Sequence, residues 1–159
     1  MDFELVSALI AGLTGAVAMT VMMMMGKSMG MTTMDIALIS GGMMTKDEEK
    51  ARRIGMMIHL VVMGTIAFGI GYALLFQAFD SVGAATGLSI GAFHGLVVGM
   101  MAMPMMGAIH PRMQPAAEGF HLDSPGFMGV AYGKGTPVGL VMGHAVYGLV
   151  VALVYRALV

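Results

Sequence analysis

The sequence contains no cysteine and no tryptophan, and only 11% of its 159 residues are charged. Without cysteine the chain forms no disulfide and offers no thiolate ligand or thiol nucleophile. Soluble domains carry about 25% charged residues, so the low share argues against a soluble globular protein. A net charge of −1, with no basic patch among aromatic residues, argues against nucleic acid as a partner.

Charged residues are also absent from four long stretches, 5–26, 54–79, 81–111 and 135–155, in a chain that is 58% hydrophobic. A helix of about 20 apolar residues crosses the hydrocarbon core of a bilayer, which is therefore the expected partner. We expect an all-α membrane protein that forms one four-helix transmembrane bundle over residues 1–159. The expected spans are about 3–25, 54–79, 82–106 and 137–158. Because the first run follows an acidic start, we expect a span there and no cleaved signal peptide.

The two long connections, 26–53 and 107–136, hold seven of the eight lysines and arginines. The positive-inside rule therefore predicts that both connections are cytoplasmic and both termini lie outside. A short interfacial helix is expected at about Met34–Ser40, ending at Gly41 and Gly42. Glu48 is spaced for a helical ion pair with Arg52. Pro104 should kink or end the third span.

Glycines recur every four residues in the third and fourth spans, which gives each helix a smooth face. The positions are Gly87, Gly91, Gly95 and Gly99, then Gly135, Gly139 and Gly143. Such faces let helix backbones approach closely in lipid. We expect these faces to pack within the chain. The alternative is contact with other subunits, in a homo-oligomer or a larger membrane complex.

The second and fourth spans also share a pattern. Gly55, His59, Gly64 and Tyr72 are echoed by Gly139, His144, Gly148 and Tyr155, which suggests two related helical hairpins. The segments His59-Leu-Val-Val-Met-Gly64-Thr65, Met103-Pro104 and His144-Ala-Val-Tyr147-Gly148 carry a resemblance. With them the chain resembles a widespread prokaryotic family of four-span membrane proteins of uncharacterised function. The resemblance implies a four-helix architecture in a prokaryotic inner membrane, and it implies no activity.

Methionine is abundant, at 22 residues, and unevenly placed. Apart from the initiator, every methionine lies within 19–63 or 100–142. In an up-and-down bundle both regions fall toward the side of the long connections. Thioether and imidazole groups are ligands for soft metals such as Cu(I). We therefore predict that the protein binds or passes Cu(I) at a cluster of these side chains. The predicted ligands are Met22, Met25, Met56, His59, Met63, Met100, Met103 and His144.

Three alternatives remain open. The methionines could be packing residues, since this flexible side chain fills irregular cores. The protein could be a non-catalytic accessory subunit that docks through its glycine faces. It could also hold a b-type haem between two of His59, His94 and His144. A structural hydrogen bond is the simpler expectation for His94, and solvent exposure for His110 and His121 in the loop. No catalytic constellation is evident, so we do not expect an enzyme.

Overall fold

The computed structural model describes residues 3–159, and every regular element within that range is a helix. Four helical stretches are long and apolar enough to cross a membrane: Leu5–Ser28, Glu48–Ala78, Ala84–Ile109 and Thr136–Leu158. The prediction of an all-α bundle with four spans is confirmed. In a bilayer such helices satisfy their own backbone hydrogen bonds and expose apolar side chains to lipid. The chain is thus a multi-pass membrane protein.

Two of the spans are continuous α-helices and two contain a π-helical segment. The first is α1 (Leu5–Ser28) and the fourth is α7 (Thr136–Leu158). The second joins α3 (Glu48–Met57), the π-helix η1 (Ile58–Phe68) and α4 (Gly69–Ala78). The third joins α5 (Ala84–Val97), the π-helix η2 (Val98–Ala102) and α6 (Met103–Ile109). The connections contain α2 (Ile36–Gly42) and the 3-10 helices η3 (Pro111–Met113) and η4 (Phe127–Tyr132).

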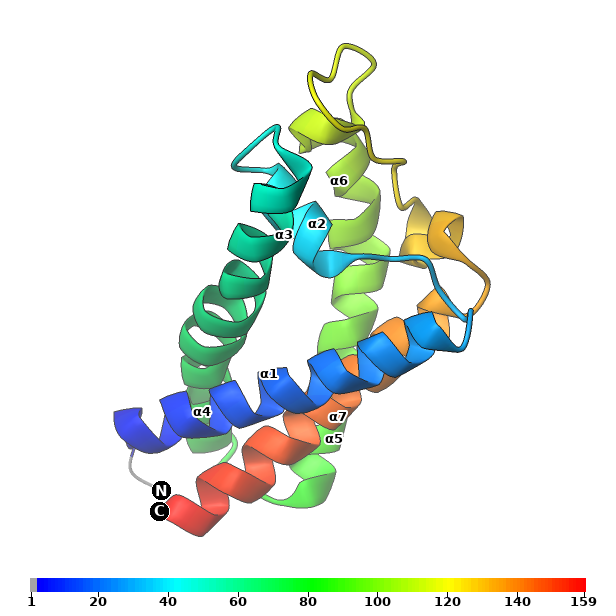
Figure 1. The fold of residues 1–159 in the computed structure, drawn as a ribbon. Helices are drawn as coiled ribbons and strands as arrows, with labels where there is room; N and C mark the ends of the chain where they lie inside the picture. Colours follow the sequence, from blue (N-terminus) through cyan, green and yellow to red (C-terminus); the bar gives the residue numbers. More distant parts are fainter. Residues whose placement is uncertain (1–2) are drawn as a thin grey trace.

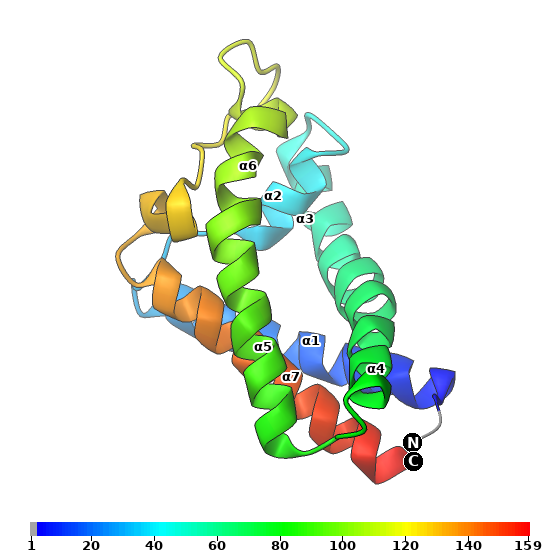
Figure 2. The same ribbon diagram turned by 180° about the vertical axis from the view of Figure 1, so that it is seen from behind.

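The spans follow one another up and down, but they are not all aligned. Figures 1 and 2 show α1 and α7 side by side and antiparallel, crossing obliquely over the other two spans. The start of α1, the end of α7 and the turn between α4 and α5 lie at one end of the molecule. The Glu4 backbone N–H donates to the Tyr155 hydroxyl at 2.9 Å, which ties the outer spans together there. Both long connections lie at the opposite end (Figure 1).

The glycine face of the third span is covered within the chain by α7. A Cβ atom added to Gly91 would clash with the His144 carbonyl, and one on Gly95 would lie 2.9 Å from the Val141 Cα. Gly87 is placed in the same way against Gly148. The remaining glycines differ: Gly99 faces the Met128 side chain, Gly143 lies near Met19, and Gly139 has no neighbour within 4 Å. Close backbone contact therefore holds α5 against α7.

Pro104 does not end the third span, which continues to Ile109. Proline has no N–H for the carbonyl four residues earlier, and its ring crowds that carbonyl. The π-helical segment η2 ends two residues before Pro104. Its wider turn gives the ring room, which is a recognised way for a helix to absorb such a break.

Two buried clusters occupy the two ends of the molecule. The first joins α1, α4 and α7 and is built from alanine, aromatic and valine side chains, with Met19 as the one methionine among its buried members in the described residues. Tyr72, Phe76, Tyr147 and Tyr155 contribute its largest side chains. The second cluster lies toward the long connections and has a different composition.

Candidate metal centre and interfacial pocket

The second buried cluster is rich in methionine. Its buried members are Met34, Ile39, Met103, Met113, Tyr132 and Leu140, with Met23, Val98, Met106 and Leu122 packed against them. We call Met23, Met34, Met103, Met106 and Met113 the methionine core. These residues come from α1, the connection before α2, α6 and η3. Four separate segments thus contribute methionines to one cluster, in which Met34, Met103 and Met113 are buried and Met23 and Met106 are partly buried.

Hydrogen bonds between distant segments hold Met34 in this cluster. The Thr33 N–H donates to the Tyr132 carbonyl at 2.7 Å, and the Thr32 and Thr136 hydroxyls are 2.8 Å apart. The Met34 N–H donates to the Thr32 Oγ1 at 3.1 Å. The connection before α2 is therefore fixed against η4 and the start of α7.

Tyr132 and Gly129 shape the η4 side of the cluster. The Tyr132 hydroxyl donates to the Asp123 carbonyl at 2.6 Å. Burial, with a smaller effect from the Asp123 charge, raises the pKa of Tyr132 to about 12, so the hydroxyl stays protonated. Gly129 has a φ of +71°, and a Cβ there would lie 2.9 Å from the Thr136 Cγ2. A left-handed glycine therefore lets the η4 turn approach the start of α7 closely.

The eight predicted ligands do not share one buried cluster. Met103 alone among them belongs to the methionine core, where its side chain is 5% exposed. Met25, Met63 and Met100 are exposed. Met22 is half-buried outside both clusters, and Met56 lines the pocket described below. Sequence reasoning missed Met23, Met34, Met106 and Met113.

The histidines of the spans form a separate arrangement. The His94 and His144 rings meet edge to face, with centroids 4.6 Å apart. The His94 Nδ1 lies 3.1 Å from the Tyr72 hydroxyl, which confirms the hydrogen bond expected for His94. The His144 Nδ1 donates to the Leu140 carbonyl at 2.8 Å. Direct ring contact leaves no space for a porphyrin between His94 and His144, so this pair does not fit a bis-imidazole haem site.

His59 differs from His94 and His144 in its hydrogen bonding, because its buried Nε2 has no hydrogen-bond partner among residues 3–159. Within the same range no group of three or more histidine, aspartate or glutamate side chains is arranged to hold a metal ion. A metal site in this part of the chain would therefore depend on thioethers.

The expectation that His110 is solvated is wrong. Its side chain is 0% exposed. The Nε2 donates to the Ile39 carbonyl at 2.8 Å, and the Nδ1 accepts from the Arg112 N–H at 3.1 Å. The Nε2 bond joins the end of α6 to α2 and the Nδ1 bond caps η3, so His110 is a structural residue.

A pocket of about 470 Å³ lies beside the methionine core, between α1, α2 and α3. Its lining residues are Thr20, Met23, Met24, Lys27, Ser28, Met34, Asp35, Ile36, Ala37, Arg52 and Met56. Four methionines form much of its wall, and three charged residues lie at one side. Met23 and Met34 belong both to this wall and to the methionine core, so the two features are adjacent.

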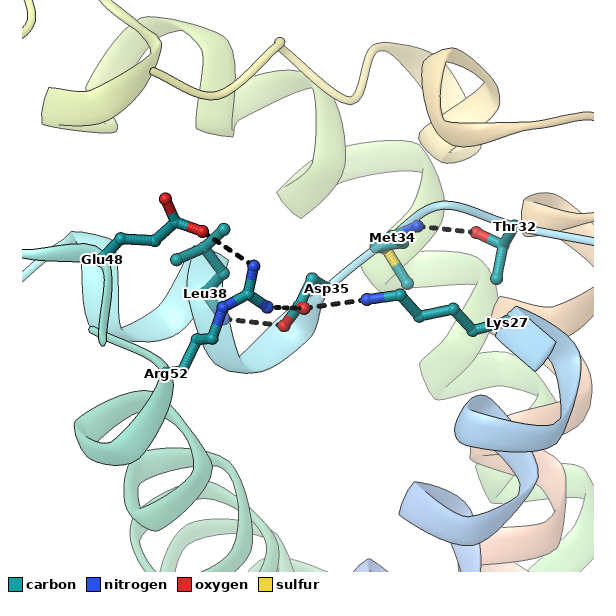
Figure 3. Close-up of polar contacts among 7 residues, drawn as sticks. All are labelled: Lys27, Thr32, Met34, Asp35, Leu38, Glu48 and Arg52. Atoms are coloured by element: carbon teal, nitrogen blue, oxygen red, sulfur yellow. Dashed lines mark hydrogen bonds and ion pairs between the residues drawn. The ribbon is translucent and has the colours of Figure 1, made fainter. Parts of the chain in front are cut away.

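The charged residues of the pocket form a connected group (Figure 3). The Asp35 carboxylate accepts from the Lys27 ammonium at 2.8 Å and from the Arg52 guanidinium. Its other oxygen accepts from the Leu38 N–H at 3.0 Å and so caps α2. Arg52 also pairs with Glu48 at 2.9 Å, as the spacing predicts. Burial raises the pKa of Asp35, but the hydrogen bonds and the nearby positive charges outweigh it, so the pKa lies below its usual value.

Comparison of the chain with known protein families, with curated proteins and with solved structures finds no match. Function must therefore be argued from the geometry of the methionine core and of the pocket.

Proposed function

We propose that this membrane protein binds a soft metal ion, with Cu(I) as the best chemical match, through the thioethers of the methionine core. The observation that carries the proposal is that four segments contribute five methionines to one cluster, three of them buried and two packed against it. Thioethers are soft, neutral ligands, and they suit a monovalent soft cation better than a hard divalent one.

The proposed ligands differ from those that helical spacing suggested. Met34, Met103 and Met113 are at most 9% exposed, and Met23 and Met106 pack against them. No histidine is among the described residues of this cluster. We therefore propose a site made of thioethers alone. It would hold or pass on the ion without catalysing a reaction.

A copper titration tests this proposal. Purified protein should bind one Cu(I) per chain in competition with a Cu(I) chelator. Replacing Met103 and Met113 together by leucine should weaken that binding at least about tenfold, because two thioethers are lost. Methionine and leucine have similar volumes, so the substitutions should cost less than about 1.5 kcal/mol of stability each.

Met101 and Met105 provide the matched control, because they flank Met103 in the sequence but are 61% and 53% exposed. Leucine at both positions should leave Cu(I) binding unchanged. Equal affinity of the wild-type protein, the core variant and the control variant would assign the methionine core to packing and overturn the proposal.

We further propose that the protein lies in a prokaryotic inner membrane with both long connections in the cytoplasm. Seven of eight lysines and arginines are in these connections, which supports this orientation. Because the chain has no cysteine, single cysteines can report it. In right-side-out vesicles an impermeant maleimide should label Phe79→Cys at once and Lys46→Cys only after permeabilisation. The reverse pattern would refute the orientation.

A further inference from the structure

The interfacial pocket combines an apolar wall with a charged rim. Met23, Met24, Met34 and Met56 supply apolar surface along α1, the connection and α3. Of the charged side chains that line it, Lys27 and Arg52 are cations and Asp35 is the one anion, so the lining carries a net charge of +1. Glu48 contacts Arg52 but is not among the lining residues.

Both cations stand where a membrane surface would be. Lys27 is in the last turn of α1, and Arg52 is in the first turns of α3, so they mark adjacent ends of two spans. Their side chains are 48% and 47% exposed and can reach a ligand from outside. Lysine and arginine at such positions sit at headgroup level and attract anionic lipids.

Asp35 fixes the position of both cations and leaves donors available. Its carboxylate lies between the Lys27 ammonium and the Arg52 guanidinium (Figure 3). An ammonium has three N–H donors and a guanidinium five. Lys27 can therefore bind another anion while keeping its contact with Asp35, and Arg52 can do so while keeping its contacts with Asp35 and Glu48. Two positioned cations beside an apolar wall are complementary to a phosphate that carries a hydrocarbon chain.

We propose that this pocket binds one anionic phospholipid from the surrounding membrane. Its phosphate would contact Lys27 and Arg52, and the upper part of an acyl chain would lie along Met24 and Met56. The volume of about 470 Å³ is within the usual range of small-molecule sites. Met24 is 63% exposed, so the rest of the chain can continue from the pocket into the bilayer. A free phosphate has no apolar part, so contact with the methionine wall would not stabilise its binding. The proposal does not depend on metal binding.

Native mass spectrometry of the delipidated full-length protein tests it, with phosphatidylglycerol and phosphatidylcholine of the same acyl chains as probes. Wild-type protein should prefer phosphatidylglycerol about tenfold or more, because each cation near the surface favours an anionic lipid. Replacing Lys27 and Arg52 by glutamine should abolish the preference. Lys46→Gln with Lys50→Gln should retain it, because these lysines lie in the same connection but do not line the pocket.

A second pair of variants keeps the test decisive if the double glutamine variant fails to fold. Met24 and Met25 are adjacent exposed methionines of α1, and only Met24 lines the pocket. Met24→Glu should lower the affinity for phosphatidylglycerol about tenfold or more by placing an anion beside the site, and Met25→Glu should not. Equal affinities in these two variants, or effective competition by glycerol 3-phosphate, would overturn the proposal. Loss of copper binding in the core variants would not affect it.

Discussion

Met101 and Met103 are two residues apart on the third span, but their side chains lie in different environments. Met101 is 61% exposed toward the surroundings of the bundle, whereas Met103 is 5% exposed within the methionine core. In lipid, exposing a methionine side chain carries no hydrophobic free-energy penalty, because the surrounding hydrocarbon is itself apolar. The abundance of methionine is therefore not itself evidence for a metal site. Only the buried subset lies together in one cluster.

At the same scale, an ion pair joins the two long connections at the surface. The Lys46 ammonium donates to the Glu118 carboxylate at 3.0 Å. This hydrogen bond, with the Lys46 charge next, holds the pKa of Glu118 below its usual value. A carboxyl group with a lowered pKa adds stability above its unfolded-state pKa and loses it as the pH falls through the folded-state pKa.

Glu118→Gln should therefore lower the midpoint of thermal unfolding at neutral pH and low salt. The difference from wild type should vanish as the pH falls through the lowered pKa of Glu118, and it should shrink in high salt because both groups are exposed. Circular dichroism of the detergent-solubilised protein measures it. A difference that persists at low pH would show that Glu118 acts by some other contact.

At the scale of elements, the contact between α5 and α7 depends on glycine. Gly91→Ala would place a methyl group against the His144 carbonyl, which is backbone and cannot rotate away. We expect it to destabilise the protein by about 1–3 kcal/mol, as overpacking does. Thermal unfolding measures the loss.

Gly139→Ala is the matched control on α7, because no atom lies within 4 Å of its added Cβ. There alanine should be neutral or stabilise by up to about 1 kcal/mol through higher helix propensity. If both variants unfold at the same midpoint temperature, that result would contradict close backbone packing of α5 against α7.

The π-helical segment η1 is a further property of an element that sequence reasoning did not predict. The Thr65 hydroxyl donates to the Leu60 carbonyl five residues earlier at 2.8 Å. The Tyr147 hydroxyl donates to the Gly64 carbonyl at 2.6 Å. These side chains satisfy carbonyl groups in the wider turn, which matters where no water is available. The Tyr147 bond comes from a distant residue and leaves no local sequence signal.

At the scale of the molecule, the number and order of the spans could be predicted because length and apolarity are enough to define them. Which face of each span points inward could not be predicted from the sequence. Within their uncharged stretches all four spans are apolar on every side, so hydrophobic periodicity does not mark the buried stripe there. Helical spacing predicts Met63 and Met100 as ligands, but both side chains are exposed, because the spacing does not identify the inward face. Met34 and Met113 lie in the connections, where helical spacing gives no information.

The two ends of the molecule also differ in a way that composition only partly anticipates. Alanine, tyrosine and phenylalanine fill the cluster near the termini, and methionine fills the cluster near the long connections. The absence of methionine from 64–99 corresponds to the first of these regions. Hydrogen bonds such as that from Thr33 to Tyr132 then select which methionines meet.

X-ray absorption at the copper K edge, on protein loaded with one equivalent of Cu(I), tests the central claim most directly. The account predicts that sulfur atoms alone are bound directly to copper, and that the Met103→Leu, Met113→Leu variant loses this signal. Nitrogen bound to copper, which would indicate an imidazole ligand such as His59 or His144, would contradict a site made of thioethers. A wild-type protein that retains no copper would contradict the metal site altogether.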